Sequence, residues 1–165
     1  MSTATVRASN PTRAERSAGF TLLEMLVTLV IVSIGMLGIA KLTLSTVQAN
    51  DSAMMRSEAT ALLQQAIENM RANDSLAQQG QYDIALGATP AITSIPTQDL
   101  NTWKTMLQTV LPGGDGSIVT ALEVNPTTGG NETVATVTVQ WDDSVAEQAF
   151  GAAAGTQSIS VETML

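Results

Sequence analysis

Two successive patterns of apolar positions occupy the first half of the chain. From Phe20 to Ala40, 21 residues carry a single charge, Glu24, and the run ends at Lys41. Beyond Lys41, apolar residues recur at three- and four-residue steps, as on one face of a helix. The members of this stripe are Met55, Ala59, Leu62, Leu63, Ala66, Ile67 and Met70. Because no proline interrupts residues 20–72, we predict one helix of about 53 residues.

The second half of the chain changes to shorter elements. Residues 74–96 have weak periodicity and predict an irregular connector. A short helix is expected to begin with Thr97 as its N-cap and to end at Pro112-Gly113-Gly114. Its apolar face would comprise Leu100, Trp103, Leu107 and Val110/Leu111. Three strand-like runs follow, at 117–124, 133–141 and 156–165, with a hairpin turn between the first two. The pattern predicts an α+β fold, with the long helix packed on a small antiparallel sheet.

The charges indicate how the apolar run is oriented. At ~1.5 Å per residue, residues 20–40 span roughly 31 Å, enough to cross the hydrocarbon core of a bilayer. Residues 1–19 carry Arg7, Arg13 and Arg16 against Glu15, whereas residues 20–165 carry four basic and fourteen acidic side chains, a net charge of −10. The positive-inside rule therefore predicts a cytoplasmic N-terminus and an external C-terminal part.

Glu24 does not fit an ordinary membrane span, because an ionisable group in lipid is costly and usually has a function and a partner. A secretory signal peptide cut after Ala40 and an uncleaved single-pass anchor are alternatives, but neither explains this carboxylate. A cut just after Gly19 would supply a partner, because the new α-amine on Phe20 would lie one helical turn away. Between staggered subunits, such a pair would set the register, since other staggers would bury an unpaired charge.

The stretch "GFTLLE" at residues 19–24, behind a basic leader and before an apolar run, resembles the class III signal of type IV pilins and type II secretion pseudopilins. The resemblance implies that Gly19 is the last residue of a leader removed by a prepilin peptidase. It also implies that Phe20 is N-methylated, with S-adenosylmethionine as donor, and that Glu24 is the assembly carboxylate. The expected parts are a leader (1–19), a transmembrane and assembly segment (20–40), an amphipathic helix half (41–73) and a globular head (74–165).

Longer stretches narrow the resemblance. "RSEATALLQQAIENMRAN" at 56–73, "SIGMLGIAKL" upstream, and "LPGGDGS", "VTVQWDD" and "VETML" in the head resemble PilV-type minor pilins. This resemblance implies insertion in the inner membrane, then incorporation into a surface pilus with the major pilin, other minor pilins and a tip adhesin. Twitching motility and adhesion would be the functions served. A minor pseudopilin of a type II secretion system is the alternative, because it shares the processing signal and Glu24.

The composition argues against most catalytic and binding chemistry. The chain has no cysteine and no histidine, which excludes disulfides and makes zinc sites and imidazole catalysis improbable. Its acidity disfavours nucleic-acid binding, including a role as a DNA-uptake pilin. Asp142 and Asp143, with Glu147 and Asp115, could bind calcium, but the EF-hand spacing is absent and adjacent acids in a loop are usually solvated. We therefore predict a structural protein, without cofactor or metal, in which Trp103 and Trp141 serve packing.

Overall fold

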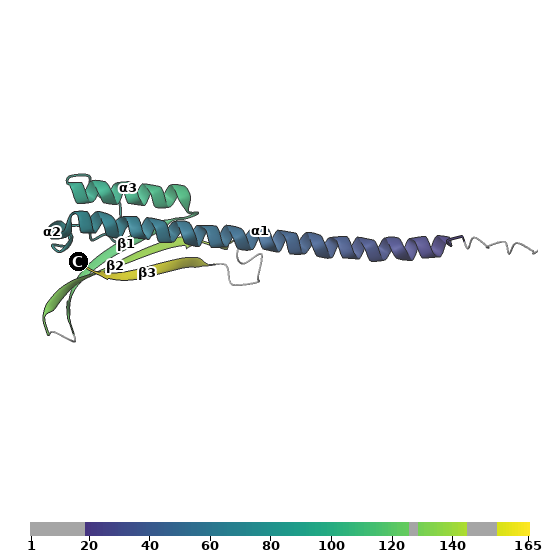
Figure 1. Cartoon of the computed structure of the whole chain (residues 1–165). Coiled ribbons are helices and arrows are strands. Elements are labelled where there is room, and N and C mark those ends of the chain that lie inside the picture. Colours follow the sequence, from purple (N-terminus) through teal and green to yellow (C-terminus); the bar gives the residue numbers. More distant parts are fainter. Residues whose placement is uncertain (1–18, 126–128, 145–154) are drawn as a thin grey trace, which may run out of the picture. The chain divides into compact units, whose positions relative to one another are not determined.

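A computed structural model describes residues 19–125, 129–144 and 155–165. The elements, in chain order, are α1 (Leu22–Ala72), α2 (Asp74–Ala77), α3 (Ile95–Val110), β1 (Asp115–Val124), β2 (Asn131–Asp142) and β3 (Thr156–Met164) (Figure 1). The chain divides into two compact units, Met1–Ala40 and Lys41–Leu165, and each unit is described by itself.

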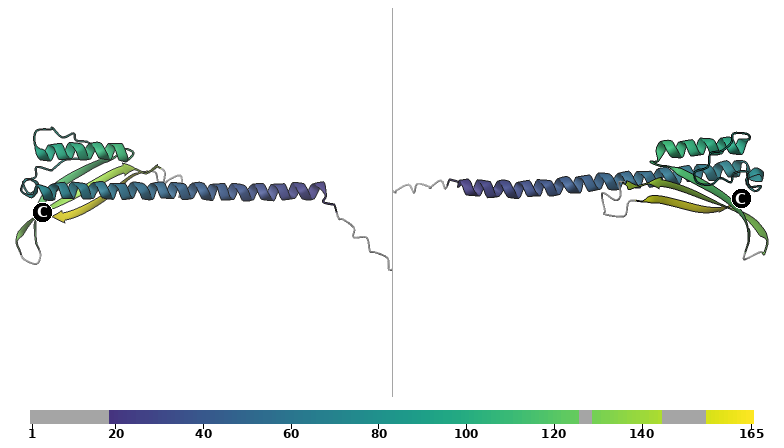
Figure 2. Two further views of the ribbon diagram at one scale, coloured as in Figure 1. Left: turned by 45° about the horizontal axis from the view of Figure 1, so that its top comes forward. Right: turned by 180° about the vertical axis from the view of Figure 1, so that it is seen from behind.

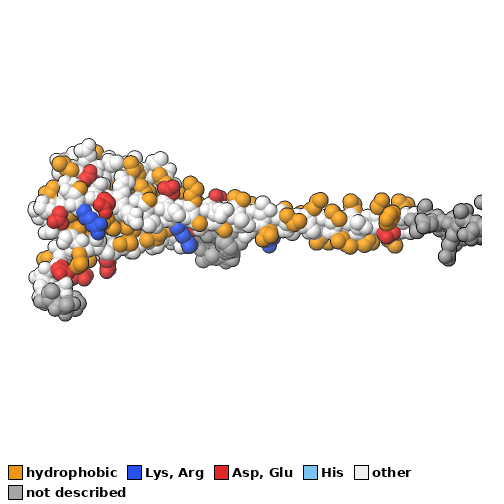
Figure 3. Space-filling model, in the orientation of Figure 1, with side chains coloured by type: hydrophobic (Ala, Val, Ile, Leu, Met, Phe, Trp, Pro, Cys, Tyr) orange, Lys and Arg blue, Asp and Glu red, His pale blue; other side chains and the backbone are white. Residues whose placement is uncertain are grey.

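The predicted long helix is confirmed. α1 runs for 51 residues and continues without interruption through Lys41. In the first unit, the large apolar side chains of α1 are exposed, and Figure 3 shows mainly hydrophobic side chains along this segment. In the second unit, the predicted stripe forms part of the core, where Ala59, Leu63 and Met70 are almost fully buried and Met55 is partly buried. The three- and four-residue spacing therefore identified the face of α1 that packs.

The sheet has the order β1-β2-β3, and both strand pairs are antiparallel. Along β2, buried residues alternate with partly exposed ones, as the sequence predicts for a strand with one face against the core. The buried set is Ala135, Val137, Val139 and Trp141. β1 begins two residues before the predicted strand, because Asp115 and Gly116 also lie in register, with Gln140 and Val139. The predicted α+β fold, with a long helix on a small antiparallel sheet, is confirmed.

Within the second unit, α1 and α3 pack against the sheet, with α3 next to β1 (Figures 1 and 2). The Trp103 side chain joins these elements. Its Nε1–H donates to the Leu62 carbonyl of α1 at 2.9 Å, and its ring lies against Gly116 of β1. A Cβ atom at Gly116 would overlap this ring, so the close approach of α3 to β1 requires glycine at that position. Trp103 and Trp141 are each 1% exposed, as expected for packing residues.

The start of α3 differs from the prediction. The N-cap is Ser94, three residues before the expected Thr97. Thr97 instead lies in the first turn, where its Oγ1 accepts the Ser94 N–H at 2.9 Å. The helix starts earlier because a proline in the first turn costs no hydrogen bond, so Pro96 does not exclude helix here. Of the two residues expected to end the apolar face, Leu111 is buried, whereas Val110 is 45% exposed.

The connector between α1 and α3 is more ordered than the sequence suggests. It begins with α2, and Ile84 then forms an isolated antiparallel bridge with Ile118 of β1. A buried ion pair holds the same region together, because Lys104 Nζ lies 2.6 Å from Asp115 Oδ1 and donates to the Ala85 carbonyl at 3.1 Å. α3, β1 and the connector are thereby joined at one point.

Candidate processing and assembly site at the start of α1

The first turn of α1 is fixed by Thr21, which directly precedes the helix. Its Oγ1 accepts the Glu24 N–H at 3.2 Å, and its carbonyl accepts the Met25 N–H at 3.2 Å. Thr21 is therefore the N-cap, and Glu24 is the third helical residue. The sequence interpretation missed the role of Thr21, although the Thr-x-x-Glu spacing of a capping box is visible in the printed sequence.

Glu24 lies in the first turn, where the free N–H groups and the helix dipole favour a negative charge. The side chain is exposed, and within 19–125, 129–144 and 155–165 its carboxylate forms no hydrogen bond or ion pair. The backbone around it is well paired, because the Thr28 hydroxyl donates to the Glu24 carbonyl at 2.7 Å. The structure thus presents a carboxylate on an ordered helical turn, available to a group from outside the described residues.

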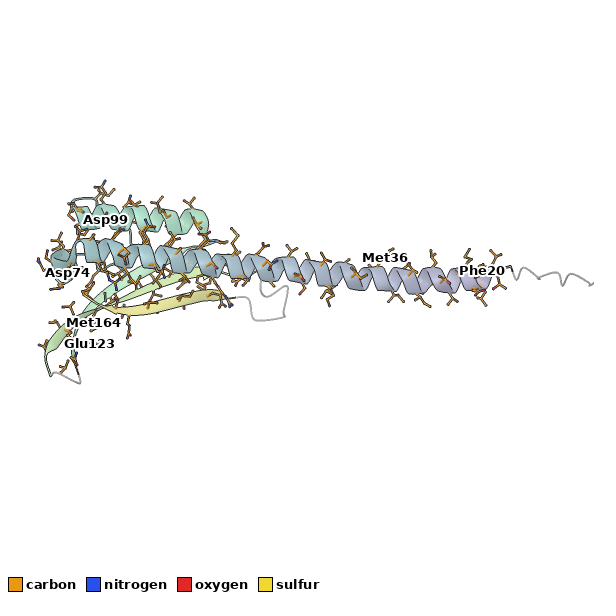
Figure 4. All side chains as sticks on the ribbon, viewed as in Figure 1. Phe20, Met36, Asp74, Asp99, Glu123 and Met164 are labelled. Atoms are coloured by element: carbon orange, nitrogen blue, oxygen red, sulfur yellow. The ribbon has the colours of Figure 1, made fainter. Side chains whose placement is uncertain are left out.

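Gly19 and Phe20 precede the helix and are exposed. No atom outside the neighbouring residues lies within 4 Å of a Cβ built at Gly19, and Phe20, labelled in Figure 4, is 77% exposed. A peptidase needs a non-helical, accessible peptide bond, and the Gly19–Phe20 bond meets both conditions. Glu24 follows Phe20 by four residues, so an α-amine created at Phe20 would lie about one helical turn from this carboxylate.

The rest of the first unit suits an apolar environment. The hydroxyls of Thr28 and Ser33 donate to carbonyls four residues earlier, so these polar groups are satisfied within the helix. Gly35 and Gly38 leave open surface, since a Cβ at either position would contact nothing within 4 Å. In the described part of the chain, α1 is the one helix whose length and composition would allow it to cross a membrane.

One family model matches this N-terminal segment. Residues 16–40 match the family model of the prokaryotic N-terminal methylation motif. The chain has the N-terminus of a type IV pilin or pseudopilin. The motif is found in structural, non-enzymatic proteins, is processed by a prepilin peptidase and precedes assembly with other pilins. No curated protein and no solved structure matched the chain significantly.

The acidic residues considered for calcium do not converge. Asp115 pairs with Lys104, and the buried Asp143 accepts a hydrogen bond from Ser52 Oγ at 2.6 Å. Asp142 is exposed, and Glu147 lies outside the described residues. Burial alone would raise the pKa of Asp115, but hydrogen bonds from Lys104 and from the Gly87 and Gly116 backbone outweigh it, so its pKa lies below the ordinary value. Among the residues that the structure describes, no three potential metal ligands form a cluster.

Proposed function

We propose that this chain is a PilV-like minor pilin, cut after Gly19, N-methylated at Phe20 and incorporated into a type IV pilus through Glu24. The observation that carries the proposal is the match of residues 16–40 to the methylation motif, together with an accessible Gly19–Phe20 bond and an exposed Glu24 on the first turn of α1. The pilin-like α+β fold of the second unit supports the same assignment.

The proposed pathway follows from the properties of the two units. Residues 1–19 form the cytoplasmic leader, residues 20–40 span the inner membrane, and residues 41–73 and 74–165 form the periplasmic part. An apolar helix leaves lipid readily only for a surrounding that is equally apolar, such as a bundle of other pilin helices. Glu24 favours that transfer, because it exchanges lipid for the cationic N-terminus of a neighbouring subunit.

The subunits around this chain would be the major pilin and other minor pilins, with a tip adhesin as a further partner. The pilus would then serve twitching motility and adhesion. The resemblance of 56–73 and of the head stretches to PilV-type chains supports the pilus rather than another assembly.

A minor pseudopilin of a type II secretion system is the second candidate, because the methylation motif is common to both classes. The neighbouring genes distinguish them. Genes for other minor pilins and a large adhesin support the pilus, whereas genes for a secretion ATPase and an outer-membrane secretin support the secretion system.

Replacement of Glu24 tests the assembly role directly. Glu24→Ala should leave cleavage and membrane insertion intact but lower incorporation into sheared pili by about tenfold or more, as expected when one partner of a buried ion pair is removed. Ser33→Ala, which removes a polar group from the same helical segment, is the matched control and should assemble normally. Incorporation of Glu24→Ala at the wild-type level would refute the pairing.

A further inference from the structure

The two edge strands of the sheet, β1 and β3, differ in how far other parts of the chain cover them. Along β1, Ile84 pairs with Ile118 through two backbone hydrogen bonds of 2.9 and 3.0 Å, and the Asp83 carboxylate accepts the Thr120 N–H at 2.9 Å. This edge is therefore covered as far as Thr120. β3 has no comparable cover in the described part of the chain, and its nine residues, Thr156–Met164, contain neither proline nor lysine. Natural proteins usually protect such an edge, because it invites pairing with another chain.

The register shows which groups of β3 are available. Leu165 lies in register with Thr133 and donates its N–H to the Thr133 carbonyl at 3.0 Å. Along an antiparallel strand, the backbone N–H and C=O groups of successive residues point to opposite sides. Every second residue of β3, counted back from Leu165, therefore also bonds to β2. Ser158, Ser160 and Glu162 lie between them and direct their backbone N–H and C=O groups to the open edge. An added strand would find these groups in the correct alternation.

A groove of about 450 Å³ lies beside this edge, between β3 and α1. Val161 of β3, which is 39% exposed, is the accessible apolar residue of its lining, whereas Leu63 and Ile67 of α1 border the groove but are only 1% and 7% exposed. Arg71 links the two elements in this lining, because its Nη2 donates to Thr163 Oγ1 at 3.2 Å while Nη1 pairs with Glu68 at 3.0 Å. Side chains on the inner face of an added strand would therefore meet Val161 together with polar groove residues such as Thr60 and Gln64.

Charge distinguishes the possible occupants. Glu162 lies on the outer face of β3, so its direct neighbour on an added strand would favour lysine or arginine. A second copy is a poor occupant, because residues 20–165 carry a net charge of −10 and two copies repel each other. The surface fits a basic segment of a different protein better.

We propose that the β3 edge and its groove bind an extended segment of a partner protein, which adds to the sheet as a fourth strand. Apolar side chains of that segment pack against Val161 in the groove, and alternate basic side chains lie beside Glu162. The backbone bonds give affinity, and the alternation gives specificity. This site belongs to the second unit and does not depend on the roles proposed for Gly19, Phe20 and Glu24.

The test uses the full mature chain in non-ionic detergent micelles and a short fluorescent peptide in which lysine and valine alternate. The control peptide has the same composition with its lysines grouped at one end. We expect the alternating peptide to bind about tenfold more tightly, because only it offers an apolar face and a basic face as a strand. In the added strand, the backbone N–H groups of the lysines would face β3. N-methylation of the backbone at the lysines should therefore abolish binding, whereas N-methylation at the valines should not.

Variants of the chain locate the site. Glu162→Lys should weaken binding by about threefold or more, because a favourable cross-strand pair becomes a repulsive one. Glu123→Lys makes the same charge change on β1 and should bind nearly as well as wild type. Bound peptide should also slow hydrogen exchange at Ser160 and Glu162, and circular dichroism should show both variants to be folded.

Three results would overturn the proposal. Equal affinity for the alternating and grouped peptides would indicate attraction by net charge alone. Equal losses in the two lysine variants would place binding away from β3. Slow exchange at Ser160 and Glu162 that depends on protein concentration, without peptide, would assign the edge to a second copy.

Discussion

Removing the Asp115 carboxylate is predicted to destabilise the second unit strongly. In the structure, the Lys104 side chain is only 6% exposed, and its Nζ lies 2.6 Å from Asp115 Oδ1. Among residues 19–125, 129–144 and 155–165, the ammonium group also donates to the Ala85 carbonyl at 3.1 Å. Asp115→Asn keeps the shape of the side chain but leaves a buried cation without its counter-charge. The interaction joins α3, β1 and the connector, so its loss should destabilise the whole second unit.

The expected magnitude follows from the burial of the two partners. Breaking a buried ion pair by removing one partner costs about 3–5 kcal/mol. Asp115 is 21% exposed, so water partly screens this pair. The asparagine oxygen can also still accept a hydrogen bond from the Gly87 N–H, which lies 2.5 Å from Asp115 Oδ2. We therefore expect a loss of about 2–3 kcal/mol in the free energy of unfolding.

Urea unfolding of the full chain in non-ionic micelles, followed by tryptophan fluorescence, measures this loss, because Trp103 and Trp141 are both buried in the second unit. Glu123→Gln removes an exposed carboxylate from the same strand and should cost less than about 0.5 kcal/mol. If Asp115→Asn cost no more than this control, the assigned role of the ion pair would be wrong.

The pKa of Asp115 gives the same prediction a dependence on pH. Because the folded pKa lies below its ordinary value of 3.8, Asp115 contributes its full stabilisation above that value and loses it as the pH falls through the folded pKa. Wild type should therefore weaken below about pH 4 by more than Asp115→Asn does. Parallel losses in the two proteins on acidification would contradict the depressed pKa.

Two further predictions concern local geometry. Thr21→Ala removes the N-cap of α1 and should speed hydrogen exchange of the Glu24 amide by about fivefold, whereas Thr21→Ser, which keeps the hydroxyl, should not; unchanged exchange in the alanine variant would exclude a capping role. Gly116→Ala places a methyl group into the Trp103 ring and should lower the free energy of unfolding by about 1–3 kcal/mol, whereas Gly87→Ala meets no neighbouring atom there and reports only the strain of its positive φ. Equal stability of Gly116→Ala and wild type would show that α3 and β1 can separate without loss.

The sequence predicts those parts of the fold in which one periodicity dominates. Two buried faces follow directly from the spacing of apolar residues in the sequence. They are the stripe from Met55 to Met70 in α1 and the alternating positions of β2. The cap at Ser94, the bridge at Ile84 and the buried Lys104 depend on residues brought together from different elements. No local pattern specifies such contacts, although Lys104 does lie on the apolar face of α3 between Trp103 and Leu107.

The candidate site was easier to predict than the head contacts, because Gly19, Phe20 and Glu24 are nearly consecutive and the motif is read from local sequence. The cap at Thr21 is equally local, because the Thr-x-x-Glu spacing from Thr21 to Glu24 is that of a capping box. The proposed partner of Glu24 cannot be read from local contacts in the chain, because in the proposal that amine forms only on cleavage and belongs to another subunit.

The N-terminus of the protein extracted from membranes and from sheared pili tests the central claim most directly. Mass spectrometry of the N-terminal peptide should show a chain that begins with N-methylated Phe20 and lacks residues 1–19, whereas Gly19→Leu should retain the leader. A mature chain that keeps residues 1–19, or that begins after Ala40, would contradict the account.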